Sequence, residues 1–375
     1  MKKINWKGVI GWCIVALAVV GCILYFNQPE QKKEGELVVA VNLPLSGPIA
    51  SFTGPYAKGL EMGVKDELKA LNLPESSVRF LMGDNQGQAM VAATLFRQQE
   101  LNDYDVYVVG TSEMASAVVD NIKESAAFIP IALAERLVQK GNNAIRPLAN
   151  FNLTRENLYS FIKQKNPKKV AVIAGCPDCQ KFAEERTIAF LKENNIDYHE
   201  ETFEWGFREY RTTALKIQKY NPDLILVNAY AAELGSMIRS LREYGLIKNN
   251  NTWASIDLVD LFEPNADLKG FKDIVFDVSE YNLNPDKEFF QNYQKIYKDE
   301  PTYMAAYGYD TGRLIVKAWI QSGKVTPETI IAQTPYDGVT GHLVMDPNTR
   351  DLISTQILGT LDENGRVIEW KEEQK

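Results

Sequence analysis

The sequence predicts an α/β protein with two doubly wound parallel-sheet lobes, preceded by an N-terminal membrane anchor. Two observations predict the lobes. Apolar, β-branched segments alternate with amphipathic segments from residue 37 onward, and the same alternation starts again near residue 158. Strands and helices that alternate in this way form mostly parallel sheets with helices on both faces. The third observation, an uncharged apolar run at residues 9–26, predicts the anchor.

Residues 1–26 are interpreted as a signal or membrane anchor, because Lys2, Lys3 and Lys7 precede 18 residues that carry no charge. An apolar run of this length is just long enough to cross a bilayer. Lysines on the amino side of such a segment stay in the cytoplasm. The rest of the chain is therefore expected outside the cell membrane, in the periplasm or at the cell surface, and tethered by its N-terminus.

Cys22 leaves two forms of this tether open. The residues Val19-Val20-Gly21-Cys22 look like a bacterial lipoprotein cleavage box, in which the cysteine would be acylated. However, the apolar run continues through residues 23–26, where a lipoprotein usually turns polar. A cleaved signal also has a shorter apolar core, of roughly 7–15 residues. The sequence favours an uncleaved anchor slightly over a lipoprotein.

A polar linker at residues 27–36 leads into the first α/β unit. Its expected strands are residues 37–45, 78–85, 106–110 and 128–133, and its expected helices are residues 56–71, 90–101 and 114–124. The second unit is expected to have strands at 168–175, 197–205, 223–230, 252–259 and 273–282, and helices at 158–165, 181–194, 211–220 and 234–244. Helices at 289–298 and 305–322 and a terminal hairpin of 339–346 with 353–370 complete the chain.

The composition excludes several classes of function. The 375 residues carry a net charge of −8 with a pI near 5.2 and no basic stripe, which argues against a nucleic-acid surface. His199 and His342 lie far apart, and only Cys176 and Cys179 have the spacing of metal ligands. A structural zinc site takes four such ligands. We therefore predict no metal site, no cofactor and no catalytic residues.

Several segments carry a resemblance to a known family through their order and spacing. They are residues 44–54, Asp84 with the helix at 88–97, residues 108–110, residues 226–230 with 233–235, residues 305–310, and residues 339–341 with Asp346 and Gly365. Over about residues 37–370, they resemble the branched-chain amino-acid (leucine/isoleucine/valine) binding proteins of ABC transporters, the periplasmic type I binding-protein family.

The resemblance implies a non-enzymatic receptor that binds a small polar solute between two lobes closing about a three-segment hinge. The chain would cross between the lobes near Ala149, Tyr281 and Thr340. The N-terminal lobe would comprise residues 37–150 with 282–340, and the C-terminal lobe residues 151–281 with 341–375. The implied partners are an ABC permease and its ATPase. A ligand sensor of the same fold is the main alternative.

In the C-terminal lobe, the resemblance places Asp257 where an acidic residue binds the ammonium group of an amino acid. A carboxylate in such a place accepts charge-assisted hydrogen bonds. The ordinary alternative is a loop aspartate that caps the next helix, a role for which Asp260 competes. Tyr230 would supply a ring wall and a hydroxyl to the ligand, and an ordinary core tyrosine is equally compatible with its position.

In the N-terminal lobe, Ser112 or Ser116 would donate to a ligand carboxylate, or else simply cap a helix. Ala132 and Leu133 fall in the loop where the family uses backbone groups and a threonine hydroxyl. Because Leu133 stands at the threonine position, one carboxylate contact is expected to be missing. Phe52 resembles the aromatic residue that packs on the ligand side chain, and a buried structural ring is its alternative.

Cys176 and Cys179 form a Cys-x-x-Cys pair that three interpretations can explain. The first is a disulfide that shapes a tight turn, since such bonds persist outside the cytoplasm. The second follows from the resemblance, which places Cys179 at a tyrosine that reaches into the cleft. The last is a thiol–disulfide oxidoreductase, because a cysteine at a helix N-terminus reacts as a thiolate. No counterpart of the cis-proline loop of such enzymes is found in the sequence.

Overall fold

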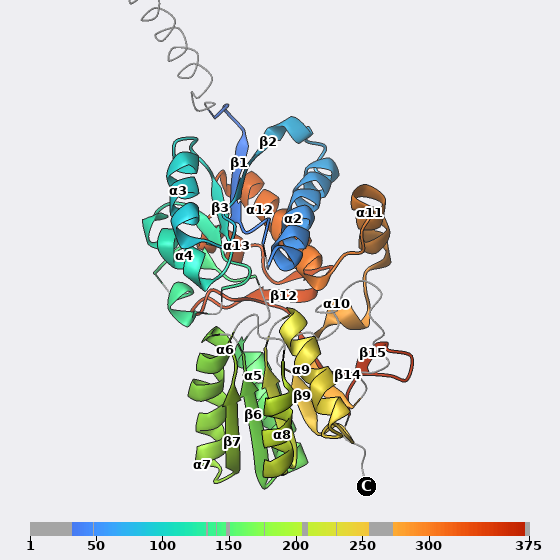
Figure 1. The fold of residues 1–375 in the computed structure, drawn as a ribbon. Helices are drawn as coiled ribbons and strands as arrows, with labels where there is room; N and C mark the ends of the chain where they lie inside the picture. Colours follow the sequence, from blue (N-terminus) through green and yellow to red (C-terminus); the bar gives the residue numbers. More distant parts are fainter. Residues whose placement is uncertain are drawn as a thin grey trace, which may run out of the picture.

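The computed structural model describes residues 32–47, 49–132, 134–139, 141–147, 151–175, 177–204, 209–229, 231–254 and 273–371. The predictions that fall outside these ranges concern the anchor at residues 1–26, Cys22, Leu133, Ala149, Cys176, Tyr230 and Asp257. Within the described ranges, no helix has the length and apolar character needed to span a membrane. Two lobes are present, each built around its own sheet (Figure 1).

Five parallel strands form the sheet of the first lobe, in the order β2–β1–β3–β4–β5. Their bounds are β1 Leu37–Leu43, β2 Val78–Asp84, β3 Val106–Val109, β4 Ala126–Phe128 and β5 Ala144–Ile145. β1 is buried along its whole length, as expected for a central strand with both faces covered. The carboxyl ends of all five strands lie at one edge, which is directed toward the second lobe in Figure 1.

Helices cover both faces of this sheet. The elements are α2 Ala50–Ala70, α11 Lys287–Tyr297, α12 Tyr303–Ser322 and α13 Pro327–Ile331 on one side, α3 Ala89–Glu100 and α4 Ser112–Val118 on the other, and the short turns Glu75–Ser77, Val119–Asn121 and Glu135–Leu137. Val39 and Val41 of β1 belong to the core under α2 and α12, whereas Ala40 belongs to the core under α3 and α4. This alternation is the period of two expected of a strand.

Glycines allow α2 and α12 to approach backbone to backbone. A Cβ atom built on Gly308 of α12 would lie 2.1 Å from the carbonyl oxygen of Tyr56 on α2. A Cβ atom on Gly63 of α2 would lie 2.0 Å from the carbonyl oxygen of Tyr309. Because no side chain fits at these positions, the two helices form one rigid layer of the first lobe.

The second lobe has a seven-stranded sheet in the order β15–β14–β10–β9–β8–β6–β7. Its strands are β6 Lys169–Ala174, β7 Asp197–Thr202, β8 Leu224–Asn228, β9 Thr252–Ala254, β10 Ile274–Ser279, β14 Gln356–Leu361 and β15 Val367–Glu369. The strands from β7 to β10 are parallel, and the β14–β15 hairpin adds antiparallel strands at one side. On the faces lie α5 Phe151–Lys165, α6 Pro177–Phe182, a π-helical turn Ala183–Ile188, α7 Ala189–Glu193, α8 Arg211–Tyr220 and α9 Ala231–Glu243.

The chain passes between the lobes at two described places. β10 ends at Ser279 in the second sheet, and Tyr281 of the short helix α10 Glu280–Leu283 packs in the first core. Leu343 and Leu352 also belong to the first core, whereas β14 starts in the second sheet at Gln356.

The return crossing therefore differs from the sequence-based expectation, which placed it near Thr340 and divided the lobes between residues 340 and 341. The segment just after Thr340 forms β12 Gly341–Met345, which pairs with β11 Tyr336–Gly338 and β13 Leu352–Ile353 in a small separate sheet. The apolar side of this sheet packs on the first lobe and keeps the segment there. The expected hairpin of residues 339–346 with 353–370 is therefore not formed. Instead, β12 pairs with β11 and β13 in the small sheet, and β14 pairs with β15 in the second sheet.

Candidate ligand-binding site

Two of the predicted residues lie in the helix that follows β3, α4, which starts at the carboxyl edge of the first sheet. Ser112 is the first residue of α4, and its Oγ accepts a hydrogen bond from the backbone N–H of Ala134, at 3.1 Å. Ser116, one turn later, donates from Oγ to the carbonyl oxygen of Ser112 at 2.5 Å. The segments after β3 and β4 are thus joined at the edge where ligands of open α/β sheets bind.

Arg136 adds a cation to this pair of serines. Its Nη2 donates to Ser116 Oγ at 2.5 Å, and the arginine is exposed. No carboxylate among the described residues forms an ion pair with Arg136. A guanidinium that is held by a hydroxyl group and has no ion-pair partner among the described residues is suited to bind a carboxylate through charge-assisted hydrogen bonds. The sequence analysis missed Arg136, although its position shortly after Leu133 could have suggested it.

The backbone groups of Ala132, which the resemblance assigns to the ligand, form hydrogen bonds within the protein. Its backbone N–H donates to the carbonyl oxygen of Ile129 at 3.2 Å, and its own carbonyl oxygen accepts from Arg146 Nη1 at 3.2 Å. Arg146 is also paired with the buried carboxylate of Asp351, with 2.6 Å between Nε and Oδ1. In this conformation both backbone groups of Ala132 are engaged within the protein.

Phe52 lies in the first turns of α2 and is partly buried against the core of the first lobe. The next residue, Thr53, packs near Gly110, because a Cβ atom on Gly110 would be 3.6 Å from Thr53 Cγ2. The start of α2 therefore lies beside the loop that leads into Ser112. The ring packs on the core with part of its surface exposed, and its role toward a ligand stays a prediction.

The edge of the second lobe holds Cys179 and the ends of β8 and β10. Cys179 is buried in α6 and is disulfide-bonded. Its pairing with Cys176, which lies outside the described residues, stays a prediction. The positions of Tyr230 and Asp257 follow β8 and β9 in the chain, and both residues also lie outside the described ranges. Their roles stay predictions too.

Asp277, near the carboxyl end of β10, is a buried acid that the sequence analysis did not single out. Its Oδ1 accepts a hydrogen bond from Asn157 Nδ2 of α5 at 2.7 Å. Burial raises the pKa of the Asp277 carboxyl to about 8, although the bond from Asn157 opposes the shift. The carboxyl is therefore mostly protonated at neutral pH.

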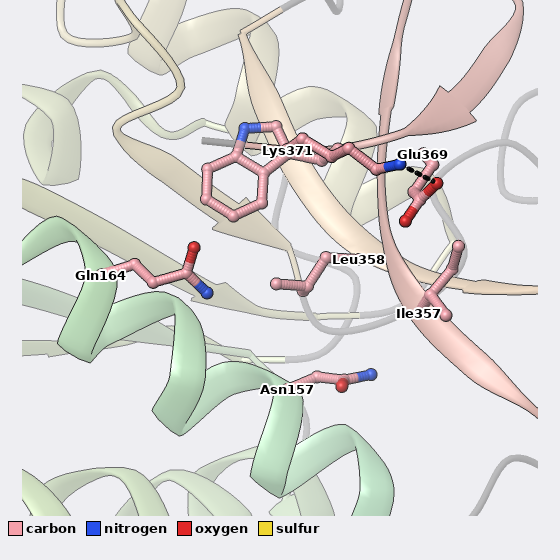
Figure 2. A pocket seen from close by; sticks show the side chains of 7 residues that line it. Asn157, Gln164, Ile357, Leu358, Glu369 and Lys371 are labelled. Atoms are coloured by element: carbon pink, nitrogen blue, oxygen red, sulfur yellow. Dashed lines mark ion pairs between the residues drawn. The ribbon is translucent and has the colours of Figure 1, made fainter. Parts of the chain in front are cut away.

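A hollow of about 440 Å³ lies on the second lobe, between α5 and the β14–β15 hairpin (Figure 2). Its lining residues are Asn157, Gln164, Ile357, Leu358, Glu369, Trp370 and Lys371. Glu369 and Lys371 form an ion pair across its rim at 2.9 Å. None of the predicted site residues lines this hollow. Groups of three or more potential metal ligands are also absent from the described part of the chain.

Comparison with known proteins gives the family. The model of the periplasmic binding protein family matches residues 36–366. The chain belongs to the periplasmic binding protein family. This result confirms the resemblance, the two-lobed α/β fold class and the prediction of a receptor that is not an enzyme. Members of the family act outside the cytoplasm, whereas a membrane tether for this chain stays a prediction.

Individual relatives are distant. The Leu/Ile/Val-binding protein homolog 3 of Brucella melitensis is 24% identical to this chain over 235 residues. The matched region covers 58% of this chain and 64% of the Brucella protein, which is less than two thirds of that protein's length. The branched-chain amino-acid binding protein LivJ of Streptococcus pneumoniae, solved with isoleucine, has a TM-score of 0.72 and 21% identity over 88% of this chain and 97% of its own. A solute-binding protein of R. palustris, solved with benzoate, has a TM-score of 0.70 and 19% identity over 89% and 95% of the two chains. At these identities, the solved structures show the fold.

Proposed function

We propose that this protein is the extracytoplasmic solute receptor of an ABC importer and binds a small carboxylate-bearing solute, an amino acid or a related compound, between its lobes. The observation that carries the proposal is the contact of Arg136 with Ser116, at the carboxyl edge of the first sheet. Isoleucine and benzoate are the ligands of the two similar structures, and the carboxylate is the one polar group that both ligands have. Family membership supports the receptor role.

The two lobes would divide the binding of an amino acid between them. The hydroxyl group of Ser112 and the guanidinium of Arg136 would hold the carboxylate on the first lobe. Ser116 Oγ, which donates to the Ser112 carbonyl oxygen and accepts from Arg136, would hold the guanidinium in place. Asp257 would hold the ammonium group on the second lobe, with Tyr230 as a wall. Closure of the lobes would remove both charged groups from water, which strengthens each hydrogen bond.

A ligand panel tests this proposal. The full chain in detergent is heated with amino acids, aromatic acids, amides and short peptides, each in a separate sample. A ligand present at 100 times its dissociation constant stabilises the folded state by about 2.7 kcal/mol, which is a measurable shift in Tm. Asp257→Ala is expected to abolish the shift given by ligands with an ammonium group. If no compound with a carboxylate shifts the Tm, the proposal is wrong.

The tether is the part of the proposal that concerns residues 1–26. An uncleaved anchor leaves the chain at full length in the membrane fraction, and Cys22→Ser does not change its fractionation. A lipoprotein instead starts at an acylated Cys22, and the same substitution prevents its maturation. Mass spectrometry of the membrane-extracted protein distinguishes the two forms, and a chain released to the soluble fraction would contradict both.

A further inference from the structure

Two buried asparagines near the carboxyl ends of central strands differ in their hydrogen bonding. Asn42 of β1 is fully engaged, because its Nδ2 donates to the carbonyl oxygen of Ala92 at 2.8 Å and to Tyr107 Oη at 2.7 Å. Its Oδ1 accepts from Asn85 Nδ2 at 3.0 Å. Asn42 is therefore a structural residue that ties α3, β3 and the loop after β2 to the centre of the first sheet.

Asn228, the last residue of β8 in the second lobe, has no such partners. The residue is 1% exposed. Neither its Oδ1 nor its Nδ2 has a hydrogen-bond partner in the described part of the protein. Nearly all buried polar side-chain atoms in native proteins are hydrogen-bonded to protein, water or a ligand. A primary amide with both of its atoms unpaired therefore indicates that a partner binds there.

The neighbourhood of Asn228 contains further unpaired polar atoms on the same face of the sheet. Val227 and Phe276 both stand opposite Ala254 of β9. Asn228 and Asp277 each lie one residue further along their strands, so the two side chains stand at the same level of the sheet, on the face opposite to Val227 and Phe276. Asp277 Oδ2 has no partner in the described residues.

Trp253 lies on the same face of the sheet as Asn228, toward α5 and the π-helical turn, and its Nε1–H is buried and unpaired within the described ranges. In the π-helical turn, Thr187 Oγ1 is likewise buried without a partner among the described residues. The neighbouring residues of that turn, Ala183 and Ile188, pack in the core on this face. π-helical turns occur frequently at functional sites. Asn228 and Asp277, each with an unpaired polar atom among the described residues, thus lie near the carboxyl ends of their strands, at the edge where the fold binds ligands.

The chemistry of a primary amide limits what can satisfy Asn228. Its Oδ1 accepts and its Nδ2 donates, and the two atoms are coplanar. A carboxamide or ureido group offers a donor and an acceptor with the same spacing, so it pairs with both atoms at once. An aliphatic side chain would leave both atoms unpaired, and a carboxylate would satisfy only the donor.

We propose that the Asn228 side-chain amide binds the ligand, and that the ligand's side chain carries a carboxamide or ureido group. This inference rests on the proposed receptor function and narrows its ligand to amino acids of the glutamine or citrulline type. Trp253 Nε1 and Asp277 Oδ2 would stand beside that group. The purely aliphatic amino acids are expected to bind more weakly.

The test compares two leucine substitutions in the full chain in detergent, with L-glutamine, L-citrulline and L-leucine as probes. Asn228→Leu removes an unpaired amide and keeps its volume, so the Tm of the ligand-free protein should stay the same or rise. Its affinity for L-glutamine and L-citrulline should fall at least about tenfold. Asn42→Leu should lower the Tm of the ligand-free protein and leave the affinity unchanged, or prevent folding altogether.

Asn228→Asp provides a second variant that keeps the shape of the side chain and loses its donor. It should also weaken the binding of both carboxamide and ureido probes. Unchanged affinity in both Asn228 variants would overturn the inference, as would a wild-type protein that prefers L-leucine. A drop in the ligand-free Tm of Asn228→Leu as large as that of Asn42→Leu would assign the amide a structural role instead. If the wild-type protein binds only carboxylates that lack a carboxamide or ureido group, such as an aromatic acid, this inference fails and the receptor proposal stands. If no compound with a carboxylate binds, both fail.

Discussion

Asp310 and Thr340 are joined by two hydrogen bonds that attach the turn between β11 and β12 to α12. Asp310 Oδ2 accepts from the backbone N–H of Thr340 at 2.9 Å and from its Oγ1 at 2.6 Å, and Oδ1 accepts from the N–H of Val339 at 3.0 Å. Asp310 is buried. A helix of the first lobe thus holds the small sheet through which the chain later returns to the second lobe.

Asp310→Ala should destabilise the protein by about 2–3 kcal/mol, because three donors lose a buried carboxyl acceptor. Denaturant unfolding, followed by tryptophan fluorescence, measures this loss. Asp337→Ala is the matched control, since Asp337 lies in the same sheet, is exposed and pairs only with His342 among the described residues. Equal stability of the two variants would show that the Asp310 bonds contribute nothing.

Replacing Asp277 by asparagine should remove part of the dependence of stability on pH. The pKa of Asp277 is raised by burial to about 8 in the folded protein, against about 4 in an unfolded chain. Between these values the folded state binds one proton more, so the free energy of unfolding falls as pH rises, by about 1.4 kcal/mol per pH unit. Below about pH 4 this penalty is absent, and above about pH 8 it is complete.

Urea unfolding at pH 5, 6, 7 and 8 measures the effect as a difference between the wild type and Asp277→Asn. The difference is needed because Asp310, whose pKa burial raises to about 6, adds a similar decline at lower pH in both proteins. The stability of Asp277→Asn relative to the wild type should rise steadily from pH 5 to pH 8. If the free energies of unfolding of the two proteins change with pH in parallel, the pKa of Asp277 is not raised by folding.

Gly308→Ala should destabilise the first lobe by about 3 kcal/mol or more, because its Cβ atom would overlap the backbone of α2 and force the helices apart. Gly54→Ala, at the start of α2, is the control: a Cβ atom there meets nothing within 4 Å. Alanine also favours a helix over glycine, by up to about 1 kcal/mol. Thermal unfolding should therefore move in opposite directions for the two variants, and similar Tm values would contradict this account of the helix contact.

Arg136→Gln should weaken the binding of a carboxylate ligand by about tenfold or more, since a hydrogen bond to a charged group contributes about 1.5–3 kcal/mol. Arg97→Gln is the control, because Arg97 is exposed on α3 in the same lobe and forms no ion pair among the described residues. Isothermal titration with the strongest ligand of the panel gives both affinities. An equal loss in the two variants would indicate a general effect of charge rather than a contact at the site.

The sequence was sufficient to predict the two sheets, because strand and helix periods are local properties. It placed the strands at β1 and β8 correctly to within about two residues. It could not place the return crossing, because residues 341–345 read as a strand whichever sheet they join. Only packing at long range, seen in Leu343 and Leu352, assigns that segment to the first lobe.

The candidate site was predicted less completely. The sequence correctly placed Ser112 at the start of a helix after a buried strand, and the role of Ser112 and Ser116 toward a ligand stays a prediction. Arg136 was missed, since an exposed arginine in a short turn has no periodic signal. Asn228 was missed for another reason. Asn42 and Asn228 both lie near the ends of apolar strands, and only the folded chain shows that Asn228 lacks side-chain partners among the described residues.

The direction of β1 determines how the receptor would stand on a membrane. Leu37 begins β1 at the amino edge of the first sheet, and Ser112 lies at the opposite, carboxyl edge. A tether that enters through the N-terminus would therefore fix the first lobe next to the lipid and hold the solute-facing edge away from it. The second lobe would then be the part that moves when a solute is bound.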